Sequence, residues 1–264
     1  MPTRYKKTTA VNQRYYTGLD RWMRGNGVSL WGAADIHGIP VPAAVSQKGL
    51  GTAVSWAIPM PPAVMAGINK GPTQAYALAY RQVNDQLNRL AAQLSHEILS
   101  KGFQAVALAA SERTDPQNIC GDFPHKTAAT LAGLGWIGRH CQLVTRPYGS
   151  WVRLGTLFTN MPLISGTPKT RAFCGQCTRC VEACPAGALT GRPWYPGIHR
   201  DALLDAGKCD SWKKSKYAEF NNGHNCGICS AVCPYGQRYY KRAAVGTGQS
   251  DSGNDFHKQR GGAE

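Results

Sequence analysis

Short apolar runs and one long amphipathic stretch dominate the first 170 residues. Two runs, at 29–36 and 52–58, are rich enough in Val, Ile, Leu and Trp to form buried strands. Between Pro72 and Gly102, apolar residues recur at steps of three and four. This periodicity predicts one face of a helix that ends at Gly102 and is carried by Val83, Leu87, Leu90, Leu94 and Ile98.

The remaining elements of this half alternate in the same way. We expect strands at 105–110, 142–145 and 153–158, and a helix at 126–131 that ends in a Gly133-Leu134-Gly135 turn. The pattern predicts an α/β core over residues 1–170.

The pattern changes at about residue 171. A cysteine-rich, loop-rich module follows, which we assign to 171–240 as a ferredoxin-like domain. The last segment, 241–264, and most clearly the part after Gly246, has almost no apolar residues, so we expect a disordered tail.

The cysteine spacing indicates iron-sulfur chemistry. The first run, Cys-x2-Cys-x2-Cys-x3-Cys-Pro, has the bacterial ferredoxin pattern. The second run is one cysteine short, and an isolated upstream cysteine can complete it. The eight ligands expected for two [4Fe-4S] clusters are Cys174, Cys177, Cys180, Cys184, Cys209, Cys226, Cys229 and Cys233.

In this pattern the last cysteine of each run binds the cluster of the other run. We therefore expect Cys233 to complete the first cluster and Cys184 the second. Zinc sites and disulfides are the alternatives for these cysteines. Cys120 and Cys141 are left over and are expected to be buried structural thiols, with a reactive nucleophile as the alternative.

The net positive charge of the chain bears on its partner. The 264-residue chain has 30 Lys and Arg against 15 Asp and Glu, a formal net charge of +15. Two clusters with their thiolates would lower this to roughly +11. A basic chain fits a nucleic acid partner, although solubility explains the charge equally well. Basic residues are dense in the first 24 residues and at Lys213, Lys214 and Lys216.

The sequence gives no sign of a membrane partner. No stretch approaches the roughly 20 apolar residues of a span, and no secretory signal is recognisable, so we expect a cytoplasmic protein.

Two clusters held by shared cysteine runs form a relay for single electrons. A plain ferredoxin needs only some 60 residues of this kind, whereas here a whole α/β core precedes the relay. We therefore expect an enzyme rather than an electron carrier.

A known family shares these motifs. The run from His125 to Arg139, which contains Ala-Gly-Leu-Gly-Trp-Ile-Gly, is followed by Gly149-Ser150-Trp151, Leu154-Gly155 and Thr159, and then by the cluster cysteines in order. This combination resembles the epoxyqueuosine reductases over roughly residues 105–236. The segment around Gly71-Pro72-Thr73, Tyr76 and Tyr80 is more similar to the short branch of that family than to its tRNA-modifying members.

The resemblance implies a cobalamin held base-off in the α/β core, close to the clusters, as in the related reductive dehalogenases. It also implies a low-potential electron donor such as ferredoxin or flavodoxin. In the tRNA-modifying members, the reaction removes an epoxide oxygen from epoxyqueuosine. The implied cofactor-binding residues are Gly133, Leu134, Gly135, Trp136, Ile137, Gly138, Ser150 and Arg153. The alternative interpretation is purely structural: these glycines form a helix-to-strand turn, and Trp136 belongs to the core.

The tRNA-modifying members carry an Asp-Thr-Gly-Pro-Val segment just before this helix, and its Asp is the expected proton donor. Here residues 119–124 read Ile-Cys-Gly-Asp-Phe-Pro, which displaces Asp122 by about three positions. His125 and Lys126 are the other catalytic candidates, unless they only cap or line the helix. The helical HEAT-type repeats of some longer members are absent.

Three functions remain open. The first is reduction of epoxyqueuosine in tRNA, the second is reduction of a small epoxide or organohalide, and the third is electron transfer to, or corrinoid reactivation of, another protein.

Overall fold

The computed structural model describes residues 10–246. Two predicted features, the basic residues before position 10 and the tail after Gly246, lie outside the described residues. The helices and strands are α1 (Ala10–Gly25), β1 (Leu30–Asp35), α2 (Ala43–Ser46), β2 (Thr52–Pro59), α3 (Pro62–Ala66), α4 (Gln74–Leu99), β3 (Ala105–Leu108), α5 (His125–Leu131), β4 (Gly135–Ile137), β5 (Leu143–Thr145), β6 (Val152–Thr159), α6 (Arg179–Glu182), the 3-10 turn Arg200–Ala202, α7 (Ala206–Lys216), α8 (Ile228–Ala231) and α9 (Pro234–Gly246).

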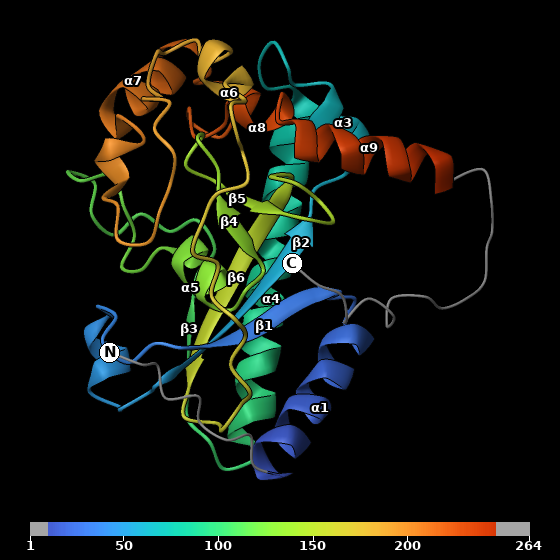
Figure 1. Ribbon diagram of the computed structural model, residues 1–264, viewed down its shortest axis with the longest axis vertical. Helices are drawn as coiled ribbons and strands as arrows, with labels where there is room; N and C mark the ends of the chain where they lie inside the picture. The colour runs from blue at the N-terminus through green and yellow to red at the C-terminus, as the bar shows by residue number, and fades with distance from the viewer. Residues whose placement is uncertain (1–9, 247–264) are drawn as a thin grey trace, which may run out of the picture.

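A four-stranded sheet in the order β1-β2-β6-β3 forms the centre of the molecule (Figure 1). All three neighbouring pairs are antiparallel, and the β2–β6 pair runs over the full length of both strands. A small antiparallel pair, β4 and β5, lies apart from this sheet. The mixed α/β class expected from the sequence is confirmed.

Helices cover both faces of the sheet. Val54, Trp56 and Ile58 of β2 belong to the core that contains the buried faces of α1 and α4. Ala53 of β2 and Phe158 of β6 belong to a second core on the opposite face, against α5. Because successive strand residues point to opposite faces, the near-continuous apolar run of β2 fits a strand buried on both sides.

Helix α4 is the longest element, with 26 residues, and it matches the predicted periodicity. Thr73 caps its start by accepting a hydrogen bond from the Tyr76 backbone N–H at 3.2 Å. Val83, Leu87 and Leu94 are all buried against the sheet. The first two turns of α4, which carry Tyr76 and Tyr80, extend towards the cysteine-rich part of the chain (Figure 1).

The cysteine-rich part lies at one end of the sheet, where its short helices are joined by loops (Figure 1). It is bound to the core by long-range contacts: the Trp151 Nε1–H donates to the Ser230 carbonyl at 2.8 Å, and α9 packs against α3. The helix α9 continues to Gly246, past the tail boundary expected at residue 241. No helix within residues 10–246 is long and apolar enough to span a membrane.

Candidate cluster and cofactor site

The eight motif cysteines lie in two groups of four. The thiols whose charges act on Cys180 are those of Cys233, Cys174 and Cys177. We call these four the cluster-one group. The second set, the cluster-two group, consists of Cys184, Cys209, Cys226 and Cys229, which act on one another in the same way. Cys229 is also affected by Cys180, so the two groups adjoin.

The grouping matches the exchange of last cysteines expected from the spacing. Cys233 lies with the first run, and Cys184 lies with the second. Cys209, far from either run in sequence, joins the cluster-two group from α7.

The thiols suit a group that neutralises several thiolates at once. Burial, reinforced by the neighbouring cysteines, raises the pKa of Cys180 to about 12. Burial also raises the pKa of Cys229 far above its usual value. Crowded thiolates of this kind are stabilised by iron. All ten cysteines are free, and among residues 10–246 no three His, Cys, Asp or Glu side chains converge on a site for a single metal ion.

Two buried N–H groups without partners lie close to these cysteines in the chain or in space. The Nε1–H of Trp136 has no hydrogen-bond acceptor within residues 10–246, and its ring packs against Phe173, the residue before Cys174. The Nδ2 of Asn225, directly before Cys226, is also unpaired among the described residues. Buried donors of this kind require an acceptor, and cluster sulfurs are acceptors.

Gly227 shows why the second run needs a glycine between its cysteines. Its φ is +82° at the start of α8, and a side chain there would collide with Ile68 and approach Tyr76. The backbone between Cys226 and Cys229 therefore lies directly against the core.

A buried ion-pair cluster fixes α7, which carries Cys209. The carboxylate of Asp210 accepts hydrogen bonds from Arg113 at 2.9 Å and 3.3 Å, and it pairs with Lys214 at 2.8 Å. The bond from Arg113 holds the pKa of Asp210 well below its usual range. The loop before α5 is thereby tied to the helix that presents Cys209.

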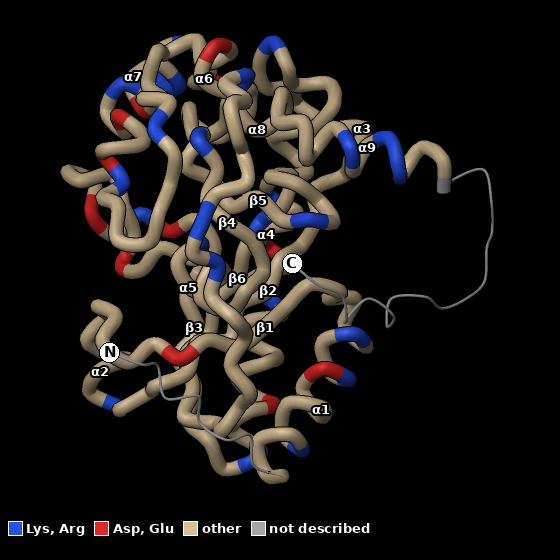
Figure 2. Tube along the Cα trace, in the orientation of Figure 1, with Lys and Arg blue, Asp and Glu red and all other residues tan. Residues whose placement is uncertain are grey.

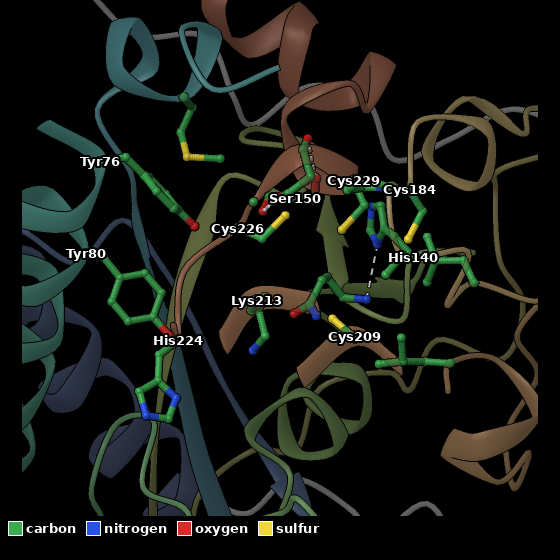
Figure 3. A pocket seen from close by; sticks show the side chains of 18 of the residues that line it. Tyr76, Tyr80, His140, Ser150, Cys184, Cys209, Lys213, His224, Cys226 and Cys229 are labelled. Atoms are coloured by element: carbon green, nitrogen blue, oxygen red, sulfur yellow. Dashed lines mark hydrogen bonds between the residues drawn. The ribbon is translucent and has the colours of Figure 1, made fainter. Parts of the chain in front are cut away.

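The cluster-two group opens onto a cavity of about 290 Å³ (Figure 3). All four of its cysteines line the cavity, whereas none of the cluster-one group does. The opposite wall includes Tyr76 and Tyr80 from α4. The other lining residues include Met60, Met65, His140, Gln142, Ser150, Arg153, Trp212, Lys213 and His224. The indole N–H of Trp212 is another buried donor without a partner within residues 10–246.

Arg153 and Tyr80 form a polar centre in this wall. The guanidinium carbon of Arg153 lies 3.8 Å from the ring centroid of Tyr80, and its Nε donates to Asn84 at 3.0 Å. The hydroxyls of Tyr80 and Ser111 are 3.2 Å apart. Burial alone would raise the pKa of Tyr80, but the charge of Arg153 lowers it below its ordinary value. The cavity thus contains a phenol whose pKa depends on the neighbouring guanidinium.

The structure separates the residues predicted to bind a cofactor. Ser150 and Arg153 line the cavity, but residues 133–138 do not. Side chains at Gly133 and Gly135 would collide with the backbone of Thr167 and Val144, which accounts for both glycines by packing within the protein. Trp136 is buried against the rings of Phe173 and Tyr235, beside the cluster-one group.

The three predicted catalytic residues do not line the main cavity and lie in two others. Asp122 lines a second cavity of about 190 Å³ and accepts a hydrogen bond from the Thr114 hydroxyl at 2.5 Å. His125 and Lys126 line a third, of about 220 Å³, which shares Gln142, Ser150, Val152 and Arg153 with the main cavity. His125 and Lys126 themselves do not line the main cavity.

The leftover cysteines differ from each other. Cys141 is buried, as expected, and its sulfur is 3.1 Å from the Lys126 ammonium. The expectation for Cys120 is wrong, since this residue is exposed. It closes a surface turn by exchanging backbone hydrogen bonds with Asp115, which leaves its side chain in solvent.

Lys213 and His224 are cavity residues that had no place in the predicted site. Each comes from a segment of the cysteine-rich part, and only the fold brings them to the cavity that Tyr80 also lines (Figure 3). The density of basic residues around Lys213 was the one sequence signal that could have indicated a functional role for this residue.

Comparison with known proteins supports the cluster assignment. Residues 173–236, which include all eight motif cysteines, match the family described as the 4Fe-4S double cluster binding domain. The prediction of two [4Fe-4S] clusters in this part of the chain is confirmed.

Curated relatives are named epoxyqueuosine reductase, in line with the predicted resemblance. One from Listeria monocytogenes is 35% identical over 140 residues, covering 52% of this chain and 32% of its own. One from Synechocystis is 32% identical over 175 residues, covering 60% of this chain and 57% of its own. The chain therefore spans about a third to three fifths of the length of these relatives.

Solved structures share the fold. A reductive dehalogenase, whose structure suggests a mechanism for B12-dependent dehalogenation, aligns with a TM-score of 0.66 at 18% identity over 92% of this chain and 35% of its own. An epoxyqueuosine reductase with an epoxyqueuosine-modified tRNA stem loop aligns with a TM-score of 0.55 at 20% identity over 85% of this chain and 66% of its own.

Proposed function

We propose that this chain is an iron-sulfur reductase that passes single electrons through its two clusters to a reducible group in the cavity beside the cluster-two group. One observation carries the proposal: Cys184, Cys209, Cys226 and Cys229 themselves form part of the cavity wall. A group bound there would be separated from the second cluster only by its ligands.

Cobalamin is the group that we propose for the cavity. The wall has a character that suits a flat macrocycle with amide side chains, because Tyr76, Tyr80 and Met65 offer large apolar surfaces. The unpaired N–H of Trp212 and the guanidinium of Arg153 are donors for amide oxygens. When bound, cobalamin would supply a metal centre that takes up single electrons and reduces the substrate.

The chain's own groups would handle the proton that a reductive step requires. Tyr80 has a lowered pKa and a hydrogen-bonded route to Ser111, which also lines the two adjoining cavities. Asp122, His125 and Lys126 line those cavities, and we assign to them the resupply of a proton from solvent rather than contact with a substrate in the main cavity.

Epoxyqueuosine in tRNA is the substrate that we propose first, because the curated relatives bear that name and the chain is basic. A small epoxide or organohalide is the second candidate. It is favoured by the better alignment with a reductive dehalogenase fold.

An anaerobic titration of cluster-loaded protein with cobalamin tests the proposal. We expect one equivalent to bind and to give a base-off cobalt signal in absorption and EPR spectra. Intact clusters without cobalamin binding would rule out a cobalamin enzyme and leave a redox partner for another protein.

The substrate is tested separately. We expect protein loaded with cobalamin and a chemical reductant to convert an epoxyqueuosine-containing tRNA stem loop. An unchanged stem loop, with cobalamin bound, would overturn the tRNA assignment and direct the assay to small epoxides and organohalides.

A further inference from the structure

A surface beside the cluster-one group carries positive charge without acidic residues. The segments 123–181 and 220–250 contain no Asp or Glu. From these segments four exposed arginines, which we call the arginine rim, lie on the β5–β6 turn, the loop before the first cysteine and α9: Arg146, Arg171, Arg238 and Arg242. Figure 2 shows basic positions on that turn and on α9 with no acidic position on either.

Aromatic rings hold the rim in place. The guanidinium carbons of Arg171 and Arg146 lie 4.9 Å and 5.7 Å from the ring centroid of Phe173. That of Arg238 lies 5.1 Å from the ring centroid of Tyr235. Cation–π contacts position these side chains without neutralising their charge.

The rim charges are also uncompensated. Arg242 donates a hydrogen bond to the Pro147 carbonyl, which is neutral. Within residues 10–246, none of the four arginines forms an ion pair.

The rim lies beside the cluster-one group. Phe173 directly precedes Cys174, and Tyr235 follows Cys233 by two residues. The Tyr235 hydroxyl donates to the Phe173 carbonyl at 3.0 Å, which joins the two cysteine runs at this point. The rings that support the arginines are therefore parts of the two loops that present the cluster-one ligands.

The cluster-one group is the end of the relay away from the cavity. None of its cysteines lines the cavity, whereas all four of the cluster-two group do. An electron source that reaches the relay from outside must therefore approach the cluster-one group, since the other end faces the bound group.

We propose that the arginine rim is the docking surface for a small acidic one-electron carrier protein that reduces cluster one. The proposal rests on the electron relay proposed above. Positive charge around the entry point would steer an acidic carrier into an orientation with its redox centre facing the cluster. A nucleic acid is the less favoured occupant, because the rim lies at the electron entry and not at the cavity where a substrate would react.

Charge reversal tests the docking surface. We compare the full chain, loaded with both clusters, with the double variant Arg171→Glu/Arg238→Glu. The matched control is Arg14→Glu/Arg21→Glu on α1, which changes the net charge equally on a helix outside the cysteine-rich part. Stopped-flow absorption follows cluster reduction by a pre-reduced acidic flavodoxin or ferredoxin at low salt.

We expect the second-order rate constant to fall at least about tenfold in the rim variant and less than about twofold in the control. The neutral variant Arg171→Gln/Arg238→Gln should lie between the two. Added salt should slow the wild-type reaction and narrow these differences.

Reduction by methyl viologen separates the two proposals. Clusters that form but accept no electrons from viologen would contradict the relay itself. The docking surface alone would be overturned by a rim variant whose clusters are reduced by viologen and are also reduced by the carrier at the wild-type rate. Weakened tRNA binding with an unchanged carrier rate would assign the rim to nucleic acid and also overturn the proposal.

Discussion

His140 is held neutral in the cavity wall. It is buried, and its Nδ1 accepts a hydrogen bond from the Gln142 backbone N–H at 3.1 Å, so the proton of the neutral ring is on Nε2. Burial, with a smaller contribution from Lys126, lowers its pKa to about 4. If Nδ1 were protonated, its N–H would face the Gln142 backbone N–H, and the hydrogen bond between them would be lost.

This histidine makes stability depend on pH. Because its folded pKa lies below the unfolded value of about 6.5, its contribution is fully present above pH 6.5. The contribution is lost as the pH falls from about 6.5 towards 4, by up to about 1.4 kcal/mol per pH unit. We expect the unfolding free energy of wild type to decline more steeply than that of His140→Gln between pH 7.5 and 5.5. Parallel declines in denaturant unfolding of the two proteins would contradict this assignment.

Single residues were predictable from the sequence where their chemistry is local. The cysteine ligands follow from spacing within short loops, and that spacing also indicated the exchange of Cys184 and Cys233. Tyr80, Lys213 and His224 were not predictable as cavity residues, because they come from three segments that meet only in the folded chain.

Helices and strands were likewise predictable where the pattern that specifies them is local. Helix α4 was predictable because its apolar stripe repeats over many turns, and β2 because it is a long apolar run. Strand β4 was not predicted, and it begins at the last residue of the expected Gly133-Leu134-Gly135 turn. It spans only Gly135–Ile137, and it is a strand because β5 pairs with it. Helix α1 also escaped prediction, since most of its positions are polar and only Leu19 and Met23 are buried.

The junction of α9 with the core depends on two glycines. A side chain at Gly236 would collide with the indole of Trp151, and one at Gly149 would collide with the backbone at Gly236. Trp151 is itself fully buried and donates to Ser230. The close approach places Cys233, just before α9, against the core.

We therefore expect Gly236→Ala to destabilise the protein by about 1–3 kcal/mol, the usual cost of overpacking. The control is Gly18→Ala in α1, where a Cβ meets nothing within 4 Å. That substitution should be neutral or stabilising, because alanine favours a helix. Thermal unfolding followed by circular dichroism measures both. An equal midpoint for Gly236→Ala and wild type would show that α9 can move away from Trp151 without cost.

At the scale of the whole molecule, the sequence predicted a relay attached to a mixed core, but not how the two are joined. Local patterns identify the relay and the strands. The cavity between α4 and the cysteine-rich part depends on contacts such as Asp210 with Arg113, which no local pattern contains. The same holds for the arginine rim, whose members are far apart in the chain.

The exchange of ligands between the runs is testable by double substitution. Cys233→Ser alone should lose one cluster and about half of the bound iron. Adding Cys177→Ser, in the same group, should lose no more iron, whereas adding Cys226→Ser, in the other group, should lose nearly all of it. Iron analysis and EPR of anaerobically loaded protein give the result. The reverse pattern would show that each run holds its own cluster.

If the two runs exchange ligands, the order of synthesis determines when each ligand set is complete. A ribosome releases Cys174, Cys177 and Cys180 well before Cys233, and Cys184 well before Cys226 and Cys229. Strands β1, β2, β3 and β6 have all been synthesised by then, so the central sheet can form while both ligand sets are still incomplete. With this exchange, iron loading would follow formation of the sheet, and a chain that ends before Cys226 would lack ligands for both clusters.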